Sequence, residues 1–230
     1  APDDLGLPGL LTTSQSFGVN LEALPDTPPG KPPLGRVNLL FVGIDWERKG
    51  GDIAVAALDE LRALGVNAVL TIVGRCPVRH RGHPAIRAMG FLNKNRARDA
   101  ARMRALYREA HLLLLPSRAD CTPMVVAEAM AHGTPVLASE VGGIPEQIGG
   151  DGAGQVLPLF TSPAEWARTI AAMTVPDRYA WMSDAAFDRA QSQLNWDVWA
   201  TRIADLARRA AQGHVPLPLE RGTNAALAQN

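Results

Sequence analysis

The stretch LLLLPSRADCTPMVVAEAMAHGTPVLAS, from Leu112 to Ser139, predicts a strand, a helix and a second strand in immediate succession. LLLLP (Leu112–Pro116) is a short, wholly apolar run, typical of a strand that is buried on both faces. We expect the helix to begin at Thr122 and Pro123, because Thr is a good N-cap and Pro suits the first helical position. The run PVLA (Pro135–Ala138) is the second buried strand.

The same alternation of buried strands and helices continues on both sides of this unit. Further strands are expected at Val37–Gly43, Ala68–Gly74, Ile86–Phe91 and Gln155–Leu157, and helices at about 52–64, 98–110, 144–148, 163–174, 177–192 and 195–211. Asp52 is the expected cap of the first of these helices. Such alternation predicts an α/β fold with a doubly wound, Rossmann-like parallel sheet, which binds its ligands at the carboxyl ends of the strands.

Composition excludes several classes of protein. The 23 basic and 23 acidic residues cancel, so net charge favours no particular partner. Cys76 and Cys121 are the only cysteines, which indicates a reducing compartment and no zinc site. No apolar run approaches the roughly 18 residues of a membrane span, and the first residues lack the pattern of a signal peptide. We therefore expect a cytoplasmic protein.

Proline content divides the chain into parts. The segment LPDTPPGKPPLG (Leu24–Gly35) has the composition of a linker. We expect residues 1–35 to be a linker or the remnant of an inter-domain segment. A single domain is then expected over residues 36–212, with a flexible tail over residues 213–230.

Two acids, Asp120 and Glu128, stand eight positions apart across the predicted junction of loop and helix. Free N–H groups at a helix N-terminus suit a phosphate, and a carboxylate further along the helix can accept hydrogen bonds from ribose hydroxyls. Glu128 lies in the apolar run MVVAEAMA, where an acid needs a partner. The alternatives are a general acid and base, as in sugar hydrolysis, or two solvated charges. We favour a nucleotide-sugar site.

A second motif, GIDWERKGGD (Gly43–Asp52), places Arg48 and Lys49 before two glycines at the end of a strand. Basic groups and exposed backbone in such a loop can hold a diphosphate, and the alternative is a solvated turn. Lysine is rare in this chain, so Lys49 carries more weight than Arg48. Neither this loop nor VGRCP (Val73–Pro77) has a GxGxxG pattern, which argues against a nicotinamide or flavin cofactor.

The stretch from Arg75 to Arg108 is strongly basic, with nine Arg and Lys94 against the single acid Asp99. We interpret it as a solvated basic face, and attraction to an anionic membrane surface is the alternative. Nucleic acid is disfavoured because only Phe91 and Tyr107 are available for base stacking. Peripheral membrane contact therefore stays open, and no nucleic-acid partner is expected.

Together these motifs resemble the C-terminal, donor-binding half of the GT-B glycosyltransferases, in particular the large retaining group known as family 4. The resemblance covers about residues 36–211, and its most specific part is the pair of acids followed by AMAHGTPVLAS and GGIPE. It implies that Glu128 binds the ribose, Asp120 contacts the transferred sugar and Lys49 holds the diphosphate.

The resemblance also implies a wider set of contacts with a nucleoside-diphosphate sugar, and no metal or other cofactor. Backbone N–H groups near Met124 and Val125 would hold sugar or phosphate, and Arg75 with the Gly90–Leu92 step would surround the base. The implied catalytic residues are Asp120, Glu128 and Lys49, and the implied donor-binding residues are Gly43, Arg48, Lys49, Arg75, Phe91, Leu92, Thr122, Pro123, Met124, Val125 and Glu128.

This sequence departs from the family pattern at several points. Asp120 stands where the family usually has Glu, Thr122-Pro123 where Phe-Gly is usual, and Ile44 where an Arg is usual. Only residues 1–35 precede the first strand, so we expect this chain to lack the acceptor-binding domain of such enzymes. We expect the donor-binding half of a retaining glycosyltransferase. The alternatives are a non-catalytic module that binds nucleotide-sugars and, less favoured, an epimerase or phosphorylase of the same fold.

Overall fold

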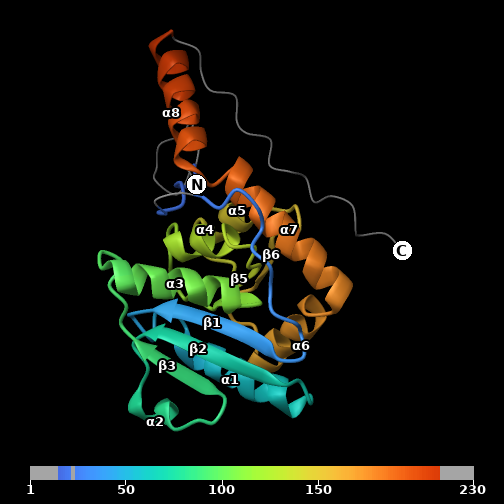
Figure 1. The fold of residues 1–230 in the computed structure, drawn as a ribbon. Coiled ribbons are helices and arrows are strands. Elements are labelled where there is room, and N and C mark those ends of the chain that lie inside the picture. The colour runs from blue at the N-terminus through green and yellow to red at the C-terminus, as the bar shows by residue number, and fades with distance from the viewer. Residues whose placement is uncertain (1–14, 22–23, 213–230) are drawn as a thin grey trace.

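The computed structural model describes residues 15–21 and 24–212, which form one parallel sheet with helices on both faces (Figure 1). The strands are β1 (Val37–Gly43), β2 (Ala68–Gly74), β3 (Ile86–Gly90), β4 (Leu112–Leu115), β5 (Val136–Ser139) and β6 (Gly154–Leu157). The helices are α1 (Gly51–Ala63), α2 (Val78–Arg81), α3 (Ala97–Glu109), α4 (Met124–Met130), α5 (Ile144–Ile148), α6 (Pro163–Met173), α7 (Pro176–Ser192) and α8 (Trp196–Ala211). The predicted doubly wound, Rossmann-like α/β fold is confirmed.

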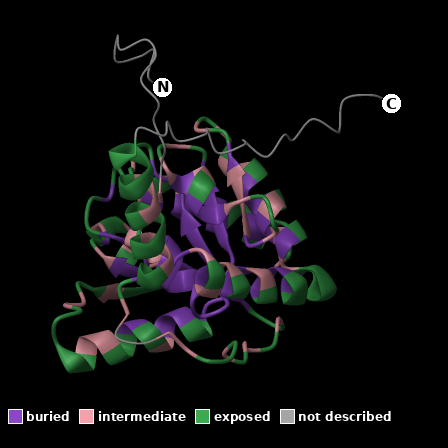
Figure 2. Ribbon diagram, turned by 90° about the horizontal axis from the view of Figure 1, so that it is seen from above, coloured by how far each residue is buried: buried purple, intermediate pink, exposed green. Residues whose placement is uncertain are grey.

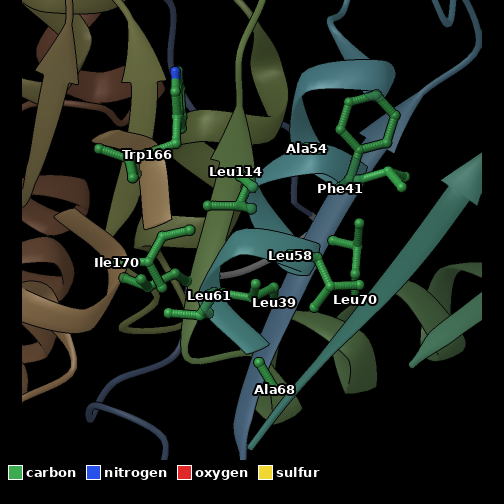
Figure 3. Close-up of a cluster of buried hydrophobic side chains, with 14 of the residues drawn as sticks. Leu39, Phe41, Ala54, Leu58, Leu61, Ala68, Leu70, Leu114, Trp166 and Ile170 are labelled. Carbon is green, nitrogen blue, oxygen red and sulfur yellow. The ribbon is translucent and has the colours of Figure 1, made fainter. Parts of the chain in front are cut away.

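Side chains of each strand alternate between two layers of core. In β1, Leu39 and Phe41 belong to the layer under α1 and α6, and Leu40 belongs to the layer under α3, α4 and α5. Figure 3 shows the first layer, where Leu58 of α1 and Trp166 of α6 meet the strand residues. The central strands are largely buried, the edge strands β3 and β6 are less so, and the outer helix surfaces are exposed (Figure 2). Apolar runs without alternation therefore form strands buried on both faces.

The strand order is β3-β2-β1-β4-β5-β6, so the direction in which strands are added reverses between β1 and β4. Connections on the two sides of such a reversal run over opposite faces, which leaves a crevice between the loops at the carboxyl ends of these two strands. Here the loops after β1 and β4 meet directly, since Arg118 N donates to Arg48 O at 2.8 Å. The fold thus brings the two motifs of the sequence to one place.

Gly50 lies at a second close contact between the two loops. Its φ is +72°, and a Cβ atom at this position would lie 1.9 Å from the carbonyl oxygen of Pro116. A side chain therefore fits neither the backbone angle nor the space.

Two predicted helix starts are wrong by one or two residues. Pro123 takes the N-cap position of α4 with an extended ψ of 116°, and the helix begins at Met124 without a side-chain cap. The cap of α1 is Gly50, in the left-handed conformation, in place of Asp52. Asp52 lies in the first turn, where its carboxylate accepts from Arg118 Nη2 at 2.7 Å. Contacts with other loops surround the backbone ahead of each helix, with Gly50 against Pro116 before α1 and Cys121 against Gly143 before α4.

The described part of residues 15–35 packs on the domain. Lys31 Nζ donates to the carbonyl oxygens of Tyr107 (3.1 Å) and Ala110 (3.0 Å) at the end of α3, and His111 Nε2 donates to Pro32 O at 2.8 Å. Val19 is buried, and its N–H donates to Leu194 O at 2.7 Å. The rest of the predicted linker, residues 1–14 and 22–23, and the predicted tail over residues 213–230 lie outside the described residues.

Helix α8 has no buried residue and projects from the body of the domain (Figure 1). Within residues 15–21 and 24–212, no helix has the length and apolar character needed to cross a bilayer.

We predict that Gly50→Ala destabilises the protein far more than Gly65→Ala does. Gly65 also has a positive φ, +83°, but a Cβ atom there would meet nothing within 4 Å. Gly65→Ala should therefore show only the conformational cost, about 1 kcal/mol, while Gly50→Ala adds an overlap with backbone worth about 2 kcal/mol more. Urea unfolding of both variants measures the difference, and equal losses would show that the loops do not need this contact.

The free energy of unfolding should rise with pH because of Lys31. Burial lowers the pKa of Lys31 from 10.5 to about 7. Between about pH 7 and about pH 10 the unfolded chain therefore binds a proton that the folded chain lacks, so raising the pH favours folding. From about pH 7.5 to about pH 9.5 the free energy of unfolding of wild type should rise by about 2–3 kcal/mol relative to that of Lys31→Met. A difference independent of pH would contradict the lowered pKa.

Candidate functional site

Lys49 and Asp120 meet at the crevice between the loops after β1 and β4. Lys49 Nζ contacts Asp120 Oδ2 in an ion pair whose side chains are only 13% and 11% exposed. Ser117 Oγ donates to the same oxygen at 3.3 Å. Gly43 leaves room for the lysine, since a Cβ atom there would lie 3.0 Å from Lys49 Cγ. The structure thus unites three predicted site residues and places a cation and a carboxylate side by side.

Arg48 reinforces this contact between the loops. Its Nη1 donates to Ala119 O at 3.0 Å and lies 3.9 Å from Asp120 Oδ1, and its Nε donates to Asp45 Oδ2 at 3.1 Å. The guanidinium is therefore engaged by both loops, with its side chain 44% exposed. An anion that binds here must compete with Asp45 and Asp120 for Arg48.

Glu128 lies deeper along α4, and its residue is 1% exposed. Its carboxylate accepts a hydrogen bond from Tyr107 Oη at 2.7 Å and is contacted at both oxygens by Lys94 Nζ. His132 Nδ1 donates to the Glu128 carbonyl at 2.8 Å, and its ring stacks on Tyr107. The predicted need of this acid for a partner is thus met by the chain itself.

Tyr107 acts as a fixed hydrogen-bond donor to Glu128. Burial, together with the neighbouring carboxylate, raises the pKa of the Tyr107 phenol well above its usual value. The phenol therefore keeps its proton at neutral pH and offers it to Glu128 Oε2.

Lys94 and Tyr107 are site residues that the sequence reasoning missed. Lys94 follows β3 in the loop 91–96, and Tyr107 lies on α3. One signal was present, since Lys94 is one of only three lysines and directly follows a segment expected at the ligand-binding edge of the sheet.

The two acids do not form a pair. Asp120 is held by Lys49 between the loops after β1 and β4, and Glu128 by Lys94 and Tyr107 on the side of α3. Each carboxylate thus has its own cation, an arrangement that favours two binding subsites over one acid–base couple.

The Gly142-Gly143 turn positions the loop that carries Asp120. Gly142 has φ +54°, and a Cβ atom there would lie 1.8 Å from the carbonyl oxygen of Asp120. Gly143 N donates to Cys121 O at 2.7 Å. Thr122, Met124 and Val125 are half-buried and Pro123 is buried, so the α4 start is accessible only in part.

The residues expected around the base follow β2 and β3, and Phe91 and Leu92 share the loop 91–96 with Lys94. Arg75 and Phe91 are exposed beyond the ends of β2 and β3, with Phe91 65% exposed. Leu92 packs against the core layer under α3. The Arg75 backbone N–H donates to Gly43 O at 3.0 Å, which fixes the spacing of the β1 and β2 ends.

Two cavities border the candidate site. A small one of about 150 Å³ is lined by Lys94, Tyr107 and Glu128 together with Asn20, Leu21, Ala100, Met103 and Arg104. A larger open cleft of about 930 Å³ is lined by Asp45, Trp46, Glu47, Asp52, Arg75, Cys76, Pro77, Val78, Arg79, Arg81 and Arg118. Neither Asp120 nor Glu128 lines the larger cleft, so size alone does not identify the site. Among the residues that the structure describes, no group of three or more His, Cys, Asp or Glu side chains is arranged for a metal ion.

Comparisons with a family model and with curated relatives agree on one family of proteins. The family described as "Glycosyl transferases group 1" matches residues 36–174. A D-inositol 3-phosphate glycosyltransferase of Streptomyces coelicolor is 31% identical over 86% of this chain and 50% of its own length. A glycogen synthase of Mycobacterium tuberculosis is 30% identical over 80% of this chain and 45% of its own length. The chain thus spans about half the length of the curated relatives it matches.

Solved structures agree with the fold. Sucrose-phosphate synthase from Thermosynechococcus elongatus matches with a TM-score of 0.61 and 23% identity, over 79% of this chain and 47% of that one. WaaG, a glycosyltransferase involved in lipopolysaccharide biosynthesis, matches with a TM-score of 0.59 and 27% identity, over 75% and 47% respectively. The expected resemblance to one half of a GT-B glycosyltransferase is confirmed.

Proposed function

The chain belongs to the glycosyl transferases group 1 family, and from that membership we propose that it binds a nucleoside-diphosphate sugar as the donor of a glycosyl transfer. The observation that carries this proposal is the contact of Lys49 with Asp120 where the β1 and β4 loops meet. Ligands of doubly wound sheets bind at this reversal of strand order. A lysine at such a place suits a ligand that brings its own negative charge.

The diphosphate would take the place of Asp120 beside Lys49. Phosphate oxygens accept charge-assisted hydrogen bonds from an ammonium, and the half-exposed Arg48 supplies a second cation. As the bond to the sugar breaks, negative charge grows on the leaving diphosphate, and cations already in position stabilise it. The Asp120 carboxylate is then free to accept hydrogen bonds from hydroxyls of the transferred sugar.

Glu128 would receive the ribose. A carboxylate in an apolar helix is costly unless hydrogen-bonded, and two hydroxyls of a ribose satisfy the two oxygens that Lys94 contacts in this structure. Exposed Phe91 and Arg75 offer an aromatic face and a guanidinium to the base. The family resemblance further supports transfer of a hexose with retention, without a metal ion.

The acceptor would bind to a second half of the enzyme. The matched relatives are about twice as long as the region they share with this chain, which supports a two-part enzyme with the donor site on this part. The rival proposal is a module that binds nucleotide-sugars without transfer. Turnover measured with this chain alone, and with the N-terminal half of a relative added, distinguishes the two proposals.

Contact with an anionic membrane surface is a further part of the proposal. Arg98, Arg102 and Arg108 are exposed on α3. None of the three forms an ion pair with an acid in the described part of the chain, so their positive charge is available to a partner.

Calorimetric titration with UDP, GDP and ADP tests the donor site. For the tightest of the three, Lys49→Ala should weaken binding by roughly 10- to 100-fold, about 1.4–2.7 kcal/mol, because a charged hydrogen bond to phosphate is lost. The same substitution should leave binding of the matching nucleoside nearly unchanged, since the nucleoside has no phosphate.

Arg98→Ala is the matched control, because it removes one positive charge from the exposed face of α3. Its affinity for the nucleoside diphosphate should stay close to that of wild type. An equal loss in Lys49→Ala and Arg98→Ala would mean that only overall charge matters, and no loss in Lys49→Ala would refute the proposed diphosphate site.

A further inference from the structure

The Lys94 ammonium contacts both carboxylate oxygens of Glu128 and so blocks other donors from them. Lys94 Nζ contacts Oε1 and Oε2, and Tyr107 Oη donates to Oε2 at 2.7 Å. The Glu128 residue is 1% exposed, so water does not reach the carboxylate freely. A pair of ligand hydroxyls can therefore approach both oxygens only after Lys94 has moved.

Lys94 is the partner that can move. Its side chain is 40% exposed, whereas the Tyr107 residue is 1% exposed and packed in the core layer under α3. The backbone around Lys94 is held independently, since Asn93 N donates to Asp99 Oδ2 at 3.0 Å and Arg96 N to Asn93 O at 2.9 Å. The lysine side chain can thus turn into solvent while the loop 91–96 keeps its shape.

We propose that Lys94 sets the affinity and the ribose specificity of the site by competing with the vicinal hydroxyls of the ligand for Glu128. This inference rests on the proposed function, because it assumes that a ribose reaches Glu128. One ammonium that donates to two oxygens is exchanged for two hydroxyls that do the same. The cavity of about 150 Å³ beside Lys94, Tyr107 and Glu128 provides room for this exchange.

The exchange has a specific consequence for ligand choice. A ribonucleotide gains two hydrogen bonds to Glu128 but must first break an ion pair that has one buried partner. The cost of breaking that pair offsets part of the binding free energy that the two hydrogen bonds supply. A nucleotide without the two hydroxyls leaves the Lys94–Glu128 pair intact. Lys94 therefore reduces the preference of the site for ribose over dideoxyribose, and its removal should increase that preference.

The test compares two ligands on three proteins. The ligands are the tightest binder among UDP, GDP and ADP and its 2′,3′-dideoxy analogue, and the proteins are wild type, Lys94→Ala and Arg98→Ala. The ratio of dideoxy to ribo dissociation constants should rise about tenfold in Lys94→Ala, chiefly through tighter binding of the ribonucleotide. Arg98→Ala, which removes a charge without contacting Glu128, should keep the wild-type ratio.

Lys94→Gln extends the test if Lys94→Ala does not fold. The glutamine amide keeps most of the length of lysine without its charge. The ratio of dideoxy to ribo dissociation constants for Lys94→Gln should therefore lie between the ratios for wild type and Lys94→Ala.

The outcomes separate the two proposals. Wild type that binds none of the three nucleotides overturns both. Wild type that binds, together with an unchanged ratio in Lys94→Ala and Lys94→Gln, overturns the competition and leaves the donor site standing. Weaker ribonucleotide binding in Lys94→Ala would also overturn the proposed competition, because Lys94 would then help to hold the ligand.

Discussion

The direct contact of two loops at the reversal of strand order is the constraint on which the site depends. Gly50 passes so close to Pro116 that only a glycine fits, and the backbone of Arg48 accepts from Arg118. This contact brings Lys49 and Asp120, 71 residues apart in sequence, into one ion pair. The order β2-β1-β4 places the contact at the carboxyl ends of parallel strands, where α/β proteins bind ligands.

Two carboxylates at this edge are each neutralised by a lysine from another segment. Removal of a buried carboxylate from water costs several kcal/mol unless charge and hydrogen bonds compensate. Glu128 obtains both from Lys94 and Tyr107, and Asp120 obtains both from Lys49 and Ser117. If the donor binds as proposed, binding at either place is an exchange of partners, and its free energy is the difference between two well-satisfied states. On that proposal the exposed cations, Lys94 and Arg48, would influence ligand binding as well as the acids do.

Much of the fold was predictable from the sequence. The apolar runs of β1, β2 and β4 have few alternatives, and their predicted bounds agree with the structure to within one residue. The need of Glu128 for a partner also followed from its apolar neighbours. The identity of that partner did not follow, because Lys94 lies 34 residues away in the loop after β3 and reaches Glu128 only in the folded chain. The predicted N-caps of α1 and α4 were wrong because contacts between loops, which the local sequence does not report, surround the backbone at both helix starts.

A structure of the chain crystallised with the nucleoside diphosphate that it binds tests the central claim most directly. We predict the terminal phosphate within hydrogen-bond distance of Lys49 Nζ, the ribose hydroxyls on Glu128 and the Lys94 side chain turned away. A nucleotide lodged instead in the larger cleft, between Arg75, Arg79 and Arg118 with both lysine–carboxylate pairs unbroken, would contradict it.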